Sequence, residues 1–220
     1  MLKIYISALL LLYTVTTRSQ SVHDLFDPQK PDITYLGIDY SHVKLIGNFS
    51  EFMEAGNRNV LDIRDRYFNS WNMVVVNERE KYNIGKMLRK SDVFYDIEMI
   101  KMINSKTNLE ELEGLNCEKF TLEDIQEFVS VYDFSEKSGT GVVFIAECLN
   151  KSAVEAIYHF VAIDMATSKV VFHRRLRGEP KGFGLRNYWI NSLHKIVEDI
   201  TYFYYGEWKH TAEELKAEEV

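Results

Sequence analysis

A basic segment with three glycines, between residues 174 and 186, contains the residue types that bind anions. Its candidate ligand-binding residues are Arg174, Arg177, Lys181, Gly182, Gly184 and Arg186. Glycine lets backbone N–H groups converge on an anion, and a helix that follows adds partial positive charge at its N-terminus. Arginine adds charge-assisted hydrogen bonds to phosphate or carboxylate. The segment therefore predicts a small anionic ligand, although it matches neither known phosphate-binding glycine pattern. The alternative is an ordinary loop between a hairpin and a helix.

Two histidines, His159 and His173, lie on neighbouring expected strands and could pair across a sheet. A metal site there needs a third ligand on the same face, such as Glu147 or Glu155. Hydrogen-bonded or solvent-facing histidines are the alternative. The chain has no H-E-x-x-H and no G-x-S-x-G pattern, which would indicate a zinc peptidase or a serine hydrolase. We therefore predict no metal, no cofactor and no catalytic residue.

Two cysteines, Cys117 and Cys148, match no metal-binding spacing. An oxidising compartment would allow them to form a disulfide. The apolar run around Cys148 fits a buried free thiol equally well. The sequence leaves these two interpretations open.

The first twenty residues have the layout of a secretory signal peptide. A short positive start is followed by an apolar run at 4–15 and a polar exit at 16–20. The apolar run is shorter than the roughly 20 residues that a spanning helix needs. We therefore expect residues 1–20 to be removed near Gln20, from a secreted or periplasmic protein.

Composition excludes some classes of protein. The 220 residues carry a formal net charge of −7, and 46% of them are hydrophobic. This balance is typical of globular proteins, and an acidic chain is a poor binder of nucleic acid. No second long apolar run exists, so we predict no transmembrane segment. The oligomeric state is not indicated.

Apolar patterning predicts the elements that position these residues. Strands are expected at 33–40 (extended by 43–46), 93–103, 141–149, 153–164 and 169–177, and helices at 57–76, 83–89, from Thr121 and at 185–205. Thr121 and Asp124 form a capping box. In the last strand, alternation places Phe172 and Arg174 on one face and His173 on the other. The last helix has the clearest apolar stripe, and Gly206 is expected to end it.

The order of elements predicts an α+β fold, with a small mixed sheet, a C-terminal antiparallel meander and helices packed mainly on one face. The expected organisation is a signal peptide (1–20), a flexible lead-in (21–32), a single domain (33–206) and an acidic tail (207–220).

Two stretches, residues 71–78 and 182–189, resemble uncharacterised secreted proteins of Bacteroides-type bacteria. The meander at 141–177 is similar to part of the curli secretion-channel protein and of the lipoprotein activators of penicillin-binding proteins. This second resemblance implies an α/β fold that binds partners. The chain lacks the anchoring cysteine of those lipoproteins.

These observations predict a secreted or periplasmic cell-envelope protein that acts by binding a partner or ligand and not by catalysis. The expected partner is an envelope protein, contacted by the sheet or by the aromatic helix end at 202–208, or a small anionic ligand. The alternative is a hydrolase or transferase with an anionic substrate at Arg174–Arg186.

Overall fold

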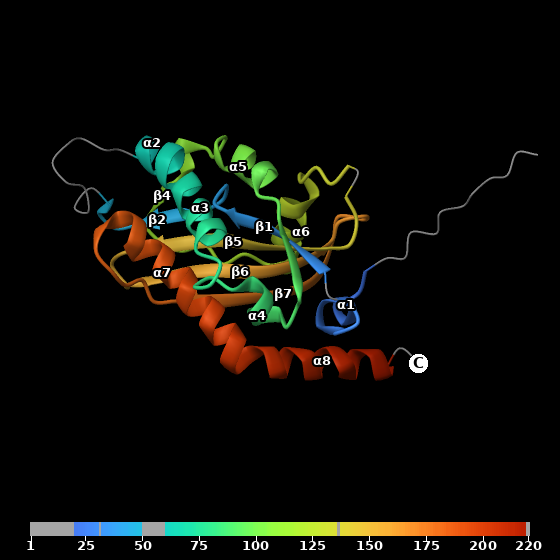
Figure 1. Ribbon diagram of the computed structural model, residues 1–220. Coiled ribbons are helices and arrows are strands. Elements are labelled where there is room, and N and C mark those ends of the chain that lie inside the picture. The colour runs from blue at the N-terminus through green and yellow to red at the C-terminus, as the bar shows by residue number, and fades with distance from the viewer. Residues whose placement is uncertain (1–19, 31, 50–59, 136, 219–220) are drawn as a thin grey trace, which may run out of the picture.

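The computed structural model describes residues 20–30, 32–49, 60–135 and 137–218. Within these ranges the chain forms a seven-stranded sheet with helices packed against it (Figure 1). The predicted α+β class is therefore confirmed. The expected signal peptide lies outside the described residues, except for Gln20. No helix in the described ranges is both long enough and apolar enough to cross a membrane.

The sheet is built around the long central strand β5. Its strands are β1 (Asp32–Asp39), β2 (Lys44–Ile46), β3 (Asp92–Tyr95), β4 (Glu113–Gly114), β5 (Thr140–Asn150), β6 (Glu155–Asp164) and β7 (Lys169–Gly178). β1 and β2 lie end to end along one edge of β5 and are parallel to it, with β3 parallel to β1 and β4 parallel to β2. The other edge of β5 pairs antiparallel with β6, which pairs antiparallel with β7. β7 is an edge strand, since no other described strand pairs with it.

Helices cover both faces of this sheet, with the larger group on one. The helical segments are α1 (Val22–Phe26), α2 (Val60–Asp62), η2 (Ile63–Phe68), α3 (Asn69–Asn77), α4 (Ile84–Leu88), α5 (Glu98–Asn104), η3 (Leu109–Glu111), α6 (Leu122–Ser130), α7 (Gly184–Asp199), η4 (Ile200–Tyr204) and α8 (Tyr205–Glu218). The main core joins one face to α3, α4, α7 and α8. A second core joins the other face to α5 and α6.

The last strand and the last long helix are packed unusually closely. Leu185, Trp189 and Leu193 of α7 are all buried, as the apolar stripe predicts. Gly178 ends β7 directly beneath this helix, and a Cβ atom there would lie only 2.1 Å from the carbonyl oxygen of Ser192. The absence of a side chain at Gly178 therefore fixes how β7 leads into α7.

The expected strand at 93–103 is wrong over most of its length. β3 ends at Tyr95, and α5 begins at Glu98. Met99 and Ile100 are buried in the second core, which a helix achieves by turning adjacent apolar residues toward one face. The imperfect alternation of this segment is therefore the pattern of a short amphipathic helix.

The expected end of the last helix at Gly206 is also wrong. The chain continues through η4, a π-helical segment, into α8 (Figure 1). Trp208 and Ala212 are buried, and Trp208 stacks on Phe160 with ring centroids 5.4 Å apart. Because this packing stabilises the helix, the segment predicted to be an acidic tail from residue 207 is instead an ordered part of the fold as far as Glu218.

Candidate functional site

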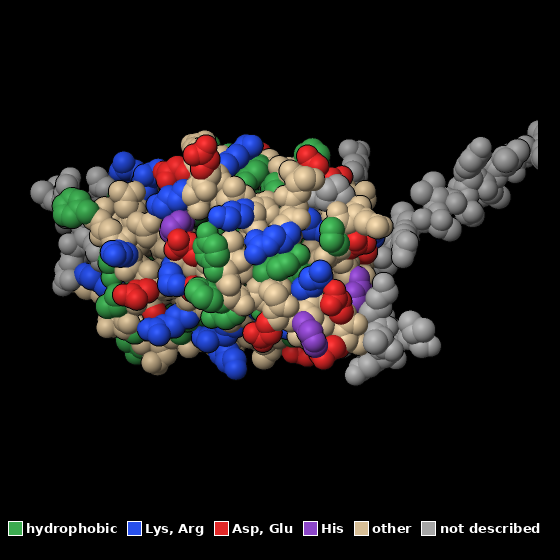
Figure 2. Space-filling model, turned by 60° about the horizontal axis from the view of Figure 1, so that its bottom comes forward, with side chains coloured by type: hydrophobic (Ala, Val, Ile, Leu, Met, Phe, Trp, Pro, Cys, Tyr) green, Lys and Arg blue, Asp and Glu red, His purple; other side chains and the backbone are tan. Residues whose placement is uncertain are grey.

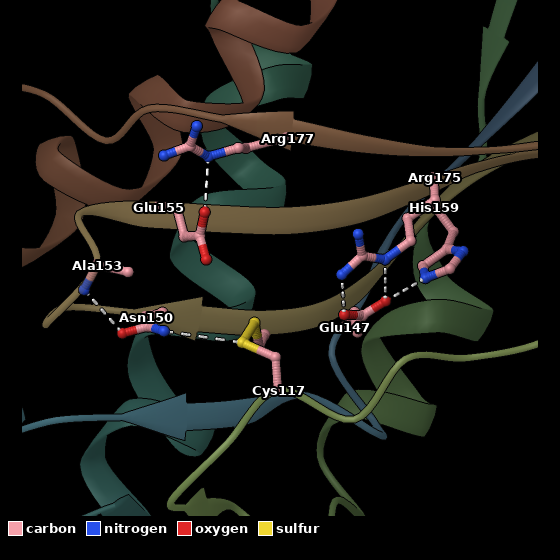
Figure 3. The surroundings of a disulfide bond; sticks show 9 residues. Cys117, Glu147, Asn150, Ala153, Glu155, His159, Arg175 and Arg177 are labelled. Atoms are coloured by element: carbon pink, nitrogen blue, oxygen red, sulfur yellow. Dashed lines mark hydrogen bonds and ion pairs between the residues drawn. A yellow bond between two sulfur atoms is a disulfide. The ribbon is translucent and has the colours of Figure 1, made fainter.

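The residues predicted to bind an anion do not share one surface. β7 continues to Gly178, so Arg174 and Arg177 belong to a strand and not to the loop. Arg174 lies with its guanidinium carbon 4.4 Å from the centre of the Phe172 ring, on the side of the main core. Arg177 lies on the other face and forms an ion pair of 2.6 Å with Glu155 (Figure 3). Strand alternation separates the two arginines because they are three residues apart.

The connection after β7 is tied back onto its own helix. The Lys181 N–H donates to the carbonyl oxygen of Tyr188 at 3.2 Å, and the Asn191 side chain donates to the Lys181 carbonyl at 2.8 Å. Gly182 and Gly184 have positive φ angles of 120° and 77°, which glycine adopts without steric cost. The glycines therefore serve the turn that closes this connection.

At Arg186, residues 182–189 contact residues 71–78; these are the two stretches that resemble secreted proteins of Bacteroides-type bacteria. The indole Nε1 of Trp71 donates to the Arg186 carbonyl oxygen at 2.9 Å. The Arg186 guanidinium lies 3.8 Å from the carboxylate of Glu78. Residues 71–78 and 182–189 therefore join α3 to the start of α7, which is a structural role.

A buried carboxylate, Glu147, is the centre of a polar network on the face of the sheet opposite α3 and α7 (Figure 3). The Arg175 guanidinium donates to both of its oxygens, at 2.7 and 2.6 Å. His159 Nε2 lies 2.8 Å from the same carboxylate, and both Glu147 and His159 are completely buried. Burial alone would raise the pKa of Glu147, but the hydrogen bonds from Arg175 and His159 lower it to about 2. Glu147 is therefore ionised.

The network extends from Glu147 through His159 to His173. His159 Nδ1 lies 2.6 Å from His173 Nε2, so the two histidines pair across β6 and β7. Burial, with smaller effects of His159 and Arg174, lowers the pKa of His173 to about 4. In the described part of the chain, no group of three His, Cys, Asp or Glu side chains is placed to hold a metal ion. We refer to the hydrogen-bonded chain from Glu147 through His159 to His173 as the relay.

A disulfide between Cys117 and Cys148 resolves the two interpretations of the cysteines. Cys148 follows Glu147 on β5, and Cys117 belongs to the segment that crosses this face of the sheet (Figure 3). Phe120, three residues further on, stacks on His159 with ring centroids 5.5 Å apart. The disulfide therefore tethers the segment that covers the Glu147–His159 part of the relay.

The exposed end of the relay faces a cavity of about 330 Å³ at the free edge of β7. Its walls are mostly apolar and come from four elements: Val22, Leu122, Val170, Val171 and Ala212. His173 and Arg174 also line the cavity, each partly buried. The cavity therefore combines apolar walls with one histidine and one guanidinium. We refer to it as the β7 pocket.

The aromatic cluster at 202–208 divides between core and surface. Trp208 is buried, whereas Tyr202 and Phe203 are 62% and 70% exposed. Lys86 of α4 donates to the Tyr202 hydroxyl at 2.9 Å. Figure 2 shows hydrophobic side chains lying among lysine and arginine side chains over the middle of one face. This cluster therefore contributes Trp208 to the core and presents Tyr202 and Phe203 at the surface.

Sequence patterns identified some parts of the β7 pocket and not others. His173 and Arg174 were singled out by their residue types, and the pairing of His159 with His173 follows from the predicted hairpin. Val22, Leu122 and Ala212 carry no local signal, because they come together only when α1, α6 and α8 pack around β7. No protein-family model matches the chain, and no curated protein matches it either.

Proposed function

We propose that this chain is an exported protein of the cell envelope that acts by binding a ligand in the β7 pocket. The observation that supports this most directly is the cavity itself, whose apolar walls surround two polar groups, His173 and Arg174. Ligand sites are commonly concave and mostly apolar, with a few polar groups that fix orientation. A cavity of about 330 Å³ lies at the lower end of the size range of such sites.

Export is supported by two independent features. The first is the signal-peptide layout of residues 1–20. The second is the bridge between Cys117 and Cys148, because disulfides form and persist in oxidising compartments. The exposed Tyr202 and Phe203 supply a further surface that suits contact with an envelope protein.

The alternative of a hydrolase or transferase at Arg174–Arg186 has weaker support. Arg177 and Arg186 face Glu155 and Glu78, and neither lines the β7 pocket. Only Arg174 of the predicted set lies at that cavity. The arginines of the predicted anionic-substrate site therefore do not converge on one cavity.

The proposal predicts that a neutral hydrophobic probe binds in the β7 pocket. The probe is N-phenyl-1-naphthylamine, whose fluorescence rises in apolar surroundings, titrated into the chain beginning at Ser21. Thr211→Phe places a large side chain at the wall of the pocket and should weaken binding about tenfold or more. Glu213→Phe, on the exposed surface of the same helix, is the matched control and should bind as the wild type does.

Two results would contradict this proposal. One is the absence of saturable fluorescence enhancement with the wild-type protein. The other is equal probe affinity for wild type, Thr211→Phe and Glu213→Phe, which would place the probe elsewhere. Circular dichroism of each variant checks that the fold is retained.

A further inference from the structure

The described part of the chain begins against a buried carboxylate. The backbone N–H of Gln20 donates to Oδ2 of Asp164 at 3.1 Å, and Asp164 is completely buried at the end of β6. We propose that export cleaves the bond between Ser19 and Gln20, and that the α-ammonium of Gln20 then forms an ion pair with Asp164. This inference rests on the proposed export of the protein and specifies its processing site.

The residues before Gln20 fit a cut at this bond. Signal peptides are cleaved where small residues occupy the last and third-last positions. A cut before Gln20 places Ser19 last and Thr17 third from last, with Arg18 between them. A cut one residue later would place Gln20 and Arg18 at these two positions, and neither is small. The cleavage pattern therefore favours Gln20 as the first residue of the exported chain, one residue earlier than the expected removal of residues 1–20.

Asp164 is oriented by donors from its own turn. Its Oδ1 accepts from the backbone N–H of Ala166 at 3.1 Å, and its Oδ2 accepts from the Thr167 hydroxyl at 2.8 Å. Such hydrogen bonds favour the ionised form of a carboxyl group. A buried carboxylate is stable when it is paired and hydrogen-bonded. An α-ammonium at the Gln20 nitrogen adds an opposite charge at hydrogen-bonding distance.

Gln20 and the residues after it are held in place by further contacts. Gln20 Oε1 accepts from the Thr140 hydroxyl at 3.4 Å, and Thr140 is the register partner of Asp164 across β5 and β6. Nζ of Lys90 donates to three carbonyl oxygens between residues 24 and 30. These contacts keep the Gln20 nitrogen beside Asp164 after the preceding residues are removed.

A terminus at Ser21 is accommodated less well. The Ser21 N–H donates to Asp24 Oδ2 at 2.8 Å, and Lys30 already forms an ion pair with Asp24. A cut before Ser21 would also remove Gln20, and with it the contacts to Asp164 and Thr140. The contacts of the two nitrogens therefore favour Gln20, in agreement with the cleavage pattern.

The ion pair should make stability depend on pH in one direction. An exposed α-amino group has a pKa of about 7.7–8, and a neighbouring carboxylate raises the pKa of an ammonium. Asp164 contacts the Gln20 nitrogen, whereas Lys169, the register partner of Asp164 in β7, is exposed. The stabilisation is therefore complete below about pH 7.7 and is lost as the pH rises through the higher pKa of the folded state.

Mass spectrometry of the chain exported by its native host tests the position of the cut. The expected first residue is Gln20 with its α-amine intact. An exported chain that begins at Ser21 or at any other residue would overturn this inference and leave the export proposal intact, whereas retention of Met1 would contradict both. N-terminal pyroglutamate would also overturn the ion pair. It forms when the α-nitrogen bonds to the side-chain carbonyl carbon and ammonia leaves, so no ammonium remains.

Urea denaturation of two chains tests the ion pair itself. One chain begins at Gln20 and the other at Thr17, in which the Gln20 nitrogen is an amide. At pH 7 the unfolding equilibrium constant should be about tenfold or more smaller for the chain that begins at Gln20, because a hydrogen bond between charged groups contributes about that factor. The difference should shrink at pH 10. Equal stabilities at pH 7 would overturn the ion pair.

Two carboxylate variants localise the charge. Asp164→Asn keeps an acceptor for Gln20 but loses the negative charge, so the two chains should be equally stable at pH 7. Asp133→Asn is the matched control, because exposed Asp133 also accepts from a backbone N–H and a hydroxyl, both of Ser135; the tenfold difference should persist. A difference that persists in Asp164→Asn would overturn the role of Asp164.

A kinetic measurement replaces Asp164→Asn if that variant does not fold. Acylation of the Gln20 α-amine at pH 7 should be about tenfold slower in the folded wild-type chain than in urea, because a pKa raised by about one unit leaves about tenfold less neutral amine. Equal acylation rates in the two conditions would overturn the ion pair.

Discussion

Glu147 shows how one buried charge orders the groups around it. A carboxylate withdrawn from water is costly unless it is paired and hydrogen-bonded, and Glu147 has both oxygens bound by Arg175 and one by His159. Because ionised Glu147 can only accept, the proton between it and His159 lies on His159 Nε2.

The titration of two individual residues, His173 and Glu147, predicts that acid destabilises the fold in two steps. The pKa of His173 falls from 6.5 to about 4 on folding, so its contribution is complete above pH 6.5 and is lost as the pH falls toward 4. The pKa of Glu147 falls from 4.5 to about 2, so its contribution is lost between those values. Urea denaturation at pH 7.5, 6.5, 5.5 and 4.5 measures the first step.

His173→Gln is the variant that identifies the source of this first step. The amide of glutamine can donate to or accept from His159 but does not titrate, so the stability of this variant should fall less than that of the wild type between pH 6.5 and 4.5. Parallel stability curves for the two proteins would assign the acid sensitivity to other groups.

Among the elements, β7 and α7 form the unit that positions the pocket. β7 presents Phe172 and Arg174 to one side and His173 to the other, as alternation predicts. Gly178 brings the end of the strand against Ser192 of α7. The helix then continues through η4 into α8, whose Thr211 and Ala212 line the pocket. The same continuous helix therefore closes the core and supplies one wall of the pocket.

Leu193→Ala should test the importance of this packing. Leu193 is completely buried in α7, and truncation of a buried leucine costs about 2–5 kcal/mol. Phe203→Ala is the comparison, because Phe203 follows on the same continuous helix and is 70% exposed; its change should stay within about 0.5 kcal/mol. Chemical denaturation measures both, and similar losses for the two variants would mean that the apolar stripe is not what anchors the helix.

On the scale of the whole molecule, the disulfide joins two parts of the chain that no local pattern connects. Cys117 and Cys148 are 31 residues apart. Cross-linking such a loop stabilises a fold by about 3–4 kcal/mol in the chain-entropy model. It also holds the segment containing Phe120 against His159. The bridge that an oxidising compartment permits thus also holds the segment that covers His159 in the buried relay.

Mass spectrometry of the protein from its native host should find a chain that begins near Ser21 and lacks two hydrogens relative to the reduced form. The physical reason is that signal-peptide removal accompanies export, and the oxidising compartment then permits the bridge. Treatment with a reductant should restore the two hydrogens. A mature chain that retains Met1, or one with two free thiols, would contradict the export proposal.

The sequence by itself determined the features that depend on neighbouring residues. The capping box of Thr121 and Asp124 is present at the start of α6, and the apolar stripe of α7 is buried. Both rest on spacings of three or four residues, which a helix converts directly into contacts. The prediction of a strand after Tyr95 is wrong, because a short helix of about two turns and a buried strand can share the same run of apolar residues.

Only the tertiary structure decided which distant residues meet. Arg174, Arg177 and Arg186 are close in sequence, yet strand alternation and the turn into α7 direct them to different surroundings. Glu147 lies at a shift in the register between β5 and β6, and a shift of one residue changes the face that a side chain occupies. The β7 pocket joins residues from Val22 to Ala212, because its walls depend on how whole helices pack around an edge strand.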